Sequence, residues 1–204
     1  MVVHLIALSV PAVVVGTALW NYTFFSWHPI CLSIAYGFLM SQGILVFSSH
    51  SSLIPNATRS KKINYHSYML LVMLAIIYIG QTVIYTVKES KGKQHLTTWH
   101  GLLGAITVLY TTVQVLAGVF VRYASLFKLP KTLTLADLKL YHGASGCTLF
   151  VLGCTTLALG LSSDWFVSHS HEYVRGLSLV AVAILAAAIF NHAYALVSAR
   201  TAKK

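Results

Sequence analysis

The chain has 204 residues, of which 57% are hydrophobic and only 9% are charged, and its mean hydropathy is +0.74. A soluble domain carries about 25% charged residues, so this composition excludes a soluble protein and indicates an integral membrane protein. The formal net charge is +10, but the basic residues lie in short loops between apolar runs, which argues against nucleic acid as a partner.

Six apolar runs follow one another along the chain, each near the roughly 20 residues that a membrane-spanning helix needs. The second run has Pro29 at a first helical position, where proline is well tolerated, and Asp137 is expected to cap the fifth helix. We predict an all-α integral membrane protein with a single domain over residues 1–204. The expected helices are about 2–20, 28–47, 63–87, 96–121, 138–161 and 174–197.

The distribution of Lys and Arg predicts the orientation, because cytosolic loops carry an excess of these residues. Ten lie on one side of the predicted topology: Arg59, Lys61, Lys62, Arg122, Lys128, Lys131, Lys139, Arg200, Lys203 and Lys204. Four lie on the other: Lys88, Lys91, Lys93 and Arg175. We therefore expect both termini in the cytosol. The terminal lysines favour an endomembrane location, in the endoplasmic reticulum or a vesicle.

Histidines stand near the starts of four successive apolar runs, namely His28, His66, His100 and His142. Ionisable residues inside membrane spans are rare and usually face the bundle interior. Two of the four share the pattern aromatic-His-Gly-x-x-Gly, in segments 99–104 and 141–146. Small residues allow a close approach to a helix. We therefore expect Gly104 and Gly146 to leave a flat gap beside the imidazoles, which a planar metal macrocycle would fit.

Alternating helix direction sorts the histidines into two pairs. His28 and His100 fall near the non-cytosolic face, and His66 and His142 near the cytosolic face. With a hydrocarbon core of about 30 Å and each histidine about one turn inside it, the pairs lie ~20 Å apart. Two facing imidazoles are the axial ligand set of a six-coordinate haem iron, which favours electron transfer over oxygen binding. We predict that helices two to five form a four-helix bundle around two haems.

Several segments resemble the cytochrome b561 family of transmembrane electron carriers, and the resemblance covers nearly the whole chain. They are Phe25-Ser26-Trp27-His28-Pro29, Leu45-Val46-Phe47-Ser48 with Ser51-Ser52-Leu53, Gly92-Lys93, His95-Leu96, His100-Gly101 and Leu138-Lys139-Leu140-Tyr141-His142. The resemblance implies two haem b groups per chain, one bound by His28 with His100 and one by His66 with His142. It also implies cytosolic ascorbate as electron donor and monodehydroascorbate or ferric iron as acceptor. The lipid bilayer is a further partner, and a homodimer is left open.

Basic residues form a cationic rim beside the cytosolic histidine pair: Arg59, Lys61, Lys62, Lys139 and Arg122. Ascorbate is a monoanion at neutral pH, so such a rim could gather and orient it. Lys62 and Lys139 are closest to their histidines and are the strongest candidates for substrate binding. The same residues also enforce membrane topology, and the sequence leaves both interpretations open.

Other histidines carry weaker hypotheses. His95 could touch an acceptor or a haem propionate, although anchoring at the membrane interface is the simpler interpretation. His169 and His171 could gather ferric iron, or could belong to a solvated loop. His192, in the last helix, is expected to pack between helices.

Two other function classes are compatible with intramembrane histidines. A metal-ion transporter usually adds Asp or Glu within its spans, and this chain has none in the predicted spans. A haem-binding sensor would need only one haem. An absorption spectrum distinguishes these classes, since only the oxidoreductase requires two haems that ascorbate can reduce.

Overall fold

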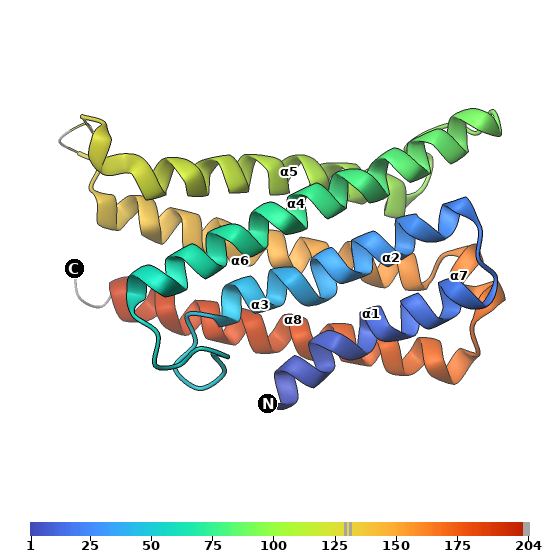
Figure 1. Cartoon of the computed structure of the whole chain (residues 1–204), viewed down its shortest axis with the longest axis horizontal. Coiled ribbons are helices and arrows are strands. Elements are labelled where there is room, and N and C mark those ends of the chain that lie inside the picture. Colours follow the sequence, from blue (N-terminus) through green and yellow to red (C-terminus); the bar gives the residue numbers. More distant parts are fainter. Residues whose placement is uncertain (129, 131, 202–204) are drawn as a thin grey trace.

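The fold is described from a computed structural model covering residues 1–128, 130 and 132–201, and all regular structure in these residues is helical (Figure 1). The α-helices are α1 (Val2–Trp20), α2 (Trp27–Ser33), α3 (Met40–Leu45), α4 (Arg59–Ser90), α5 (Trp99–Tyr123), α6 (Leu135–Leu161), α7 (Asp164–His169) and α8 (Glu172–Thr201). Two short 3₁₀ helices, η1 (Phe24–Ser26) and η3 (Ala124–Leu126), and one π-helical segment, η2 (Ile34–Leu39), complete the set.

Six segments of the described chain are long and apolar enough to cross a membrane, which confirms the predicted six-span, all-α fold. They are Val2–Trp20, Phe24–Leu45, Arg59–Ser90, Trp99–Leu126, Leu135–Leu161 and Glu172–Asn191. The second span is continuous from η1 through α2, η2 and α3. Each span buries only part of its surface against the others, as expected for helices whose outer faces meet lipid.

Polar caps shift two helix starts from their predicted positions. α5 begins at Trp99 rather than near residue 96, because the Thr98 hydroxyl accepts a hydrogen bond from the Gly101 N–H at 3.1 Å. α6 begins at Leu135, and the prediction that Asp137 is its cap is wrong. Thr134 is the N-cap, and Asp137 completes a capping box by accepting from the Thr134 N–H at 3.1 Å.

Four of the spans form two packed pairs, and the other two spans lie along one side of them. The α2–η2–α3 span packs against α4, and α5 packs against α6. α1 lies against α2 and α8, and α8 lies against α6, so that these two helices cover one side of the other four (Figure 1). Apolar residues from α1, α4, α6 and α8 form a common core, which includes Val10, Ile77, Phe150 and Leu185.

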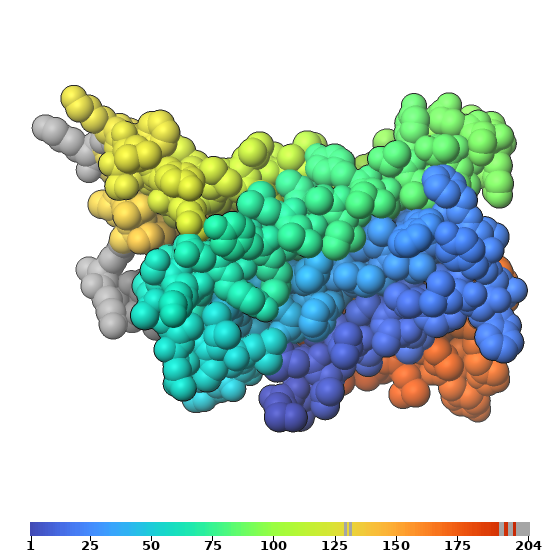
Figure 2. All heavy atoms as spheres, in the orientation of Figure 1, coloured from blue at the N-terminus to red at the C-terminus, as the bar shows by residue number. Residues whose placement is uncertain are grey.

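The two ends of the bundle differ in form. We call the end where α1 starts and α8 finishes the terminal end, and the opposite end, where α7 lies, the distal end. At the distal end, the connection between α4 and α5 stands out from the bundle (Figure 2). Lys91 and Lys93 are exposed in this connection.

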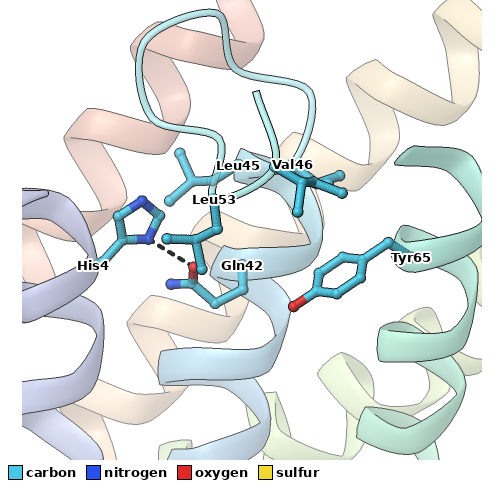
Figure 3. Close-up of a pocket in the computed structure, with 7 residues that line it drawn as sticks. His4, Gln42, Leu45, Val46, Leu53 and Tyr65 are labelled. Atoms are coloured by element: carbon cyan, nitrogen blue, oxygen red, sulfur yellow. Dashed lines mark hydrogen bonds between the residues drawn. The ribbon is translucent and has the colours of Figure 1, made fainter. Parts of the chain in front are cut away.

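His4 connects α1 to α3 and to the loop that follows α3 at the terminal end. Its Nδ1 lies 2.7 Å from Oε1 of Gln42, and its Nε2 lies 2.8 Å from the carbonyl oxygen of Ser51. Figure 3 shows the imidazole turned toward Gln42, with Leu53 and Tyr65 on other sides of the same pocket. The pocket has no room for a water molecule, so it is a packing contact between α1, α3 and the following loop.

Candidate functional site

The four candidate histidines meet as two pairs, one toward each end of the bundle. We call His28 (α2) with His100 (α5) the distal pair, and His66 (α4) with His142 (α6) the terminal pair. The ring centroids of the distal pair are 6.2 Å apart with an interplanar angle of 82°, and those of the terminal pair are 6.3 Å apart at 84°. The structure therefore brings together the partners that the alternating helix direction predicted.

Main-chain carbonyls fix three of the four imidazoles. Nδ1 of His28 lies 3.0 Å from the Gly80 oxygen, and Nδ1 of His66 lies 2.7 Å from the Gly43 oxygen. Nδ1 of His100 lies 3.1 Å from the oxygen of Thr156. A carbonyl can only accept, so Nδ1 carries the proton and Nε2 keeps its lone pair.

The spacing of the rings fits one metal atom between each pair. A metal–imidazole bond is about 2 Å long and the ring centre lies about 1 Å behind the nitrogen, so a shared metal separates two ring centres by about 6 Å. The observed separations of 6.2 and 6.3 Å agree with this value. Two facing imidazoles, with Nδ1 bonded to a main-chain carbonyl in three of the four rings, form a donor set that fits a bis-His haem.

The two pairs are separated by most of a membrane thickness. On α4, His66 belongs to the terminal pair, and the carbonyl oxygen of Gly80 contacts His28 of the distal pair. These two residues are fourteen positions apart, which separates the two pairs by about 21 Å at about 1.5 Å per residue. On the second span, the matching interval from His28 to Gly43 is fifteen residues. The π-helical turn of η2 lies inside this interval and accommodates the additional residue.

Two glycines outside the repeated motif leave space for the rings. A Cβ atom on Gly160 would lie 3.0 Å from Cε1 of His100, and one on Gly118 would lie 3.0 Å from Cε1 of His142. The expectation for Gly146 is wrong, because a Cβ there would meet Nε2 of Gln114 at 3.0 Å rather than an imidazole.

A cavity of about 260 Å³ adjoins the distal pair. His28 and His100 line it, and so does Gly104, whose predicted place beside the imidazoles this supports. Lys88 and Thr98 also line it. An apolar cavity with a few polar groups and two metal-binding imidazoles suits a large planar cofactor.

Two separate contacts between hydroxyl groups join the helices between the two pairs. The Tyr36 hydroxyl lies 2.9 Å from Oγ1 of Thr111, and Oγ1 of Thr107 lies 3.0 Å from Oγ1 of Thr156. Tyr36, Thr107 and Thr156 also line the distal cavity. The ring of Tyr36 fits because residue 153 is glycine, where a Cβ would lie 2.9 Å from Cδ1 of the tyrosine.

The fourth imidazole differs from the other three. Nδ1 of His142 faces the side-chain amide of Gln114, whose Nε2 is 3.2 Å away and also donates to the His142 carbonyl oxygen at 2.7 Å. Gln114 was not among the site residues predicted from the sequence. A glutamine inside an apolar span was the available signal, since buried polar groups in a membrane need partners.

The cationic rim is only partly assembled beside the terminal pair. Arg122 donates to Oδ1 of Asn64 at 2.7 Å and to Oγ of Ser67 at 3.1 Å, so it braces α4 on both sides of His66. The other candidates stand on the same helices as the pair: Arg59, Lys61 and Lys62 in the first turn of α4, and Lys139 three residues before His142. Lys62 and Lys139 are half-buried, whereas Arg59 and Lys61 are exposed.

The histidines with weaker hypotheses lie at the distal end or outside the described side chains. His95 lies 2.8 Å from a carboxylate oxygen of Glu89, stacks on Tyr85 and lines the distal cavity. His169 stacks on Trp165, whereas His171 stacks on Tyr173. The side chain of His192 lies outside the part of the chain that the structure describes. Among the described residues, no cluster of three or more His, Cys, Asp or Glu could hold a metal ion.

Comparisons with known proteins agree with this geometry. Residues 27–167, which include all four histidines, match the family described as eukaryotic cytochrome b561. The chain is 37% identical to the transmembrane reductase CYB561D2 of Bos taurus over 188 residues, which is 92% of this chain and 83% of that protein. It is 39% identical to the Homo sapiens protein of that name over 165 residues (81% and 73%). It is 30% identical to the probable transmembrane reductase CYB561D1 of Mus musculus (80% and 70%).

Proposed function

This chain belongs to the cytochrome b561 family of transmembrane oxidoreductases, and we propose that it transfers electrons from cytosolic ascorbate to monodehydroascorbate or ferric iron across the membrane. Membership of the family implies binding of haem b. We propose two such haems per chain, one held by His66 and His142 and one held by His28 and His100. When bound, each supplies a one-electron redox centre without an open coordination position.

The observation that best supports this proposal is the matched geometry of the two pairs. Both have ring centroids about 6 Å apart, as a shared metal atom requires, and both stand on helices that hold the imidazoles rigidly. The axial separation of about 21 Å along α4 suits two redox centres in series and excludes a single shared metal site. The carbonyls that orient three of the rings are part of the rigid helices.

The distribution of charge supports the proposed direction. Arg59, Lys61, Lys62 and Lys139 stand at the terminal end, which we infer to be cytosolic because Lys and Arg concentrate there. We propose that they attract ascorbate, with Lys62 and Lys139 nearest the reacting end, and that Arg122 contributes charge while it braces α4. Each ascorbate that loses one electron also releases one proton at the terminal end and becomes monodehydroascorbate. One acceptor gains that electron at the distal end, where ferric iron becomes ferrous or monodehydroascorbate takes up a proton and becomes ascorbate.

The proposal is tested by loading proteoliposomes with ascorbate and following the absorption spectrum of the protein and the reduction of external acceptors. We expect two haem b per chain, both reduced by ascorbate, and separate rates for monodehydroascorbate and ferric chelates. A colourless protein would instead favour a metal-ion transporter. One haem without electron transfer would favour a sensor.

The pairing of ligands is tested by His100→Ala. Removing one imidazole of the distal pair should abolish the haem there and leave most of the haem at the terminal pair, because the pairs share no ligand. The haem-to-protein ratio and the low-spin electron paramagnetic resonance spectrum measure both. Retention of two haems in this variant would disprove the pairing of His28 with His100.

A further inference from the structure

Gln114 is a buried amide inside a membrane span, with only 8% of its surface exposed. A buried amide is costly without hydrogen bonds, and this one has them. Its Nε2 donates to the His142 carbonyl oxygen at 2.7 Å, and its Oε1 accepts from the Ser145 hydroxyl at 2.8 Å. Gly146 provides the space, because a Cβ there would lie 3.0 Å from Nε2. The surface of α6 is therefore shaped around this side chain.

Each histidine of the α5–α6 pair faces two residues of the other helix, one that contacts its Nδ1 and one glycine that contacts its ring. The two arrangements differ in the group that contacts Nδ1. His100 is held by the carbonyl of Thr156, and the glycine that contacts its ring follows four residues later. Gln114 occupies the corresponding position opposite His142, with its ring-contacting glycine also four residues later. At this position a side-chain amide faces Nδ1, whereas the other three imidazoles have main-chain carbonyls.

This difference affects the electronic properties of the ligand. A neutral imidazole that binds iron through Nε2 carries its proton on Nδ1, and accepting a hydrogen bond from that proton raises the basicity of the ligand. As placed, the amide presents its nitrogen to Nδ1 of His142 at 3.2 Å, so this ring lacks the acceptor that the other three rings have. Turning the amide oxygen toward the ring would set it against the His142 carbonyl oxygen, to which the nitrogen donates at 2.7 Å, and the Ser145 hydroxyl donates to the amide oxygen in the observed arrangement.

We propose that Gln114 is a positioning residue for His142, and that its amide sets the reduction potential of the haem at the terminal pair independently of the haem at the distal pair. The inference rests on the proposed function, since it requires a haem at each pair. Hydrogen bonds to axial ligands are among the means by which proteins adjust haem potentials. A main-chain carbonyl cannot be altered by substitution, whereas this amide can.

The test is Gln114→Leu in the purified full-length protein, with Gln114→Met as a second variant of similar size. In a potentiometric titration followed by absorption, we expect the reduction equilibrium constant of one haem to decrease about tenfold, which is about 59 mV for a one-electron step. The decrease follows because the amide nitrogen places the positive end of its dipole beside the ligand and so disfavours oxidised iron, and both variants remove that dipole. The electron paramagnetic resonance signal of the same haem should move, because its ring is no longer held.

The matched control is Thr112→Val, two residues away on α5. It removes a side-chain hydrogen bond of 2.9 Å to the Tyr78 hydroxyl and touches no histidine. It should leave both midpoint potentials unchanged. If both haems are present and neither potential moves in the Gln114 variants, or if both move equally, the inference is overturned. If the parent protein lacks two haems, it is the proposed function that fails.

Discussion

Replacing Gly160 by alanine places a methyl group against the imidazole of His100. The new Cβ would lie 3.0 Å from Cε1, whereas ordinary contacts of this kind begin at 3.4 Å, so the ring must retreat by about 0.4 Å. The Cβ belongs to a rigid helix and the imidazole to a side chain, so the imidazole is the group that moves.

The movement needed is large on the scale of the hydrogen bond that orients the ring. Nδ1 of His100 lies 3.1 Å from the Thr156 oxygen, near the upper end of the range of about 2.7–3.2 Å for N–H···O bonds. Loss of an orienting partner of a metal ligand costs about 10–100-fold in affinity. We therefore expect haem affinity at the distal pair to fall by about 1.4–2.8 kcal/mol.

Transfer of haem to excess apomyoglobin measures this loss, and the haem-to-protein ratio after purification gives a second reading. Gly176→Ala is the control, because a Cβ there meets nothing within 4 Å. The haem of the terminal pair should be released at the parent rate in both variants. If Gly160→Ala releases neither haem faster than the parent, the close contact does not position His100 and the reasoning fails.

Two further variants test the donor end and the middle of the bundle. Lys62→Ala combined with Lys139→Ala should slow reduction by ascorbate in stopped-flow measurements and leave reduction by dithionite nearly intact. The effect should be larger at low salt, since charges act over about 10 Å at 0.1 M. Tyr36→Phe removes the 2.9 Å hydrogen bond to Thr111 and should cost about 1 kcal/mol, or roughly 2–4 °C in melting temperature, without changing the haem spectrum.

A specific result would contradict each of these two predictions. Equal ascorbate rates for the double lysine variant and the parent at both salt concentrations would leave membrane topology as the only role of those lysines. Haem content must match the parent in that comparison, because a lost ligand would mimic a lost docking site. An unchanged melting temperature for Tyr36→Phe would show that the hydrogen bond between Tyr36 and Thr111 contributes no net stability.

The membrane class, the number of spans and the four candidate histidines could all be predicted from residue order. These are properties of residue type along the chain: an apolar run of about 20 residues must cross the bilayer as a helix, because unpaired backbone groups are too costly there. Helix direction then alternates, which places His28 with His100 and His66 with His142 without further information. The helix ends were less well predicted because single polar caps such as Thr134 decide them.

The groups that hold each ring are identified only once the helices are packed together. Gly43, Gly80 and Thr156 act through carbonyl oxygens on neighbouring helices. Every residue has such an oxygen, so residue type does not show which one will accept the hydrogen bond. Gly118 and Gly160 each lie eighteen residues beyond a histidine on their own helix but contact the ring of the partner helix. The glycines predicted to flank the rings were those next to each histidine in the chain, whereas the glycines that contact the rings are set by how two helices pack. Packing joins residues far apart in the chain, and local spacing therefore could not identify them.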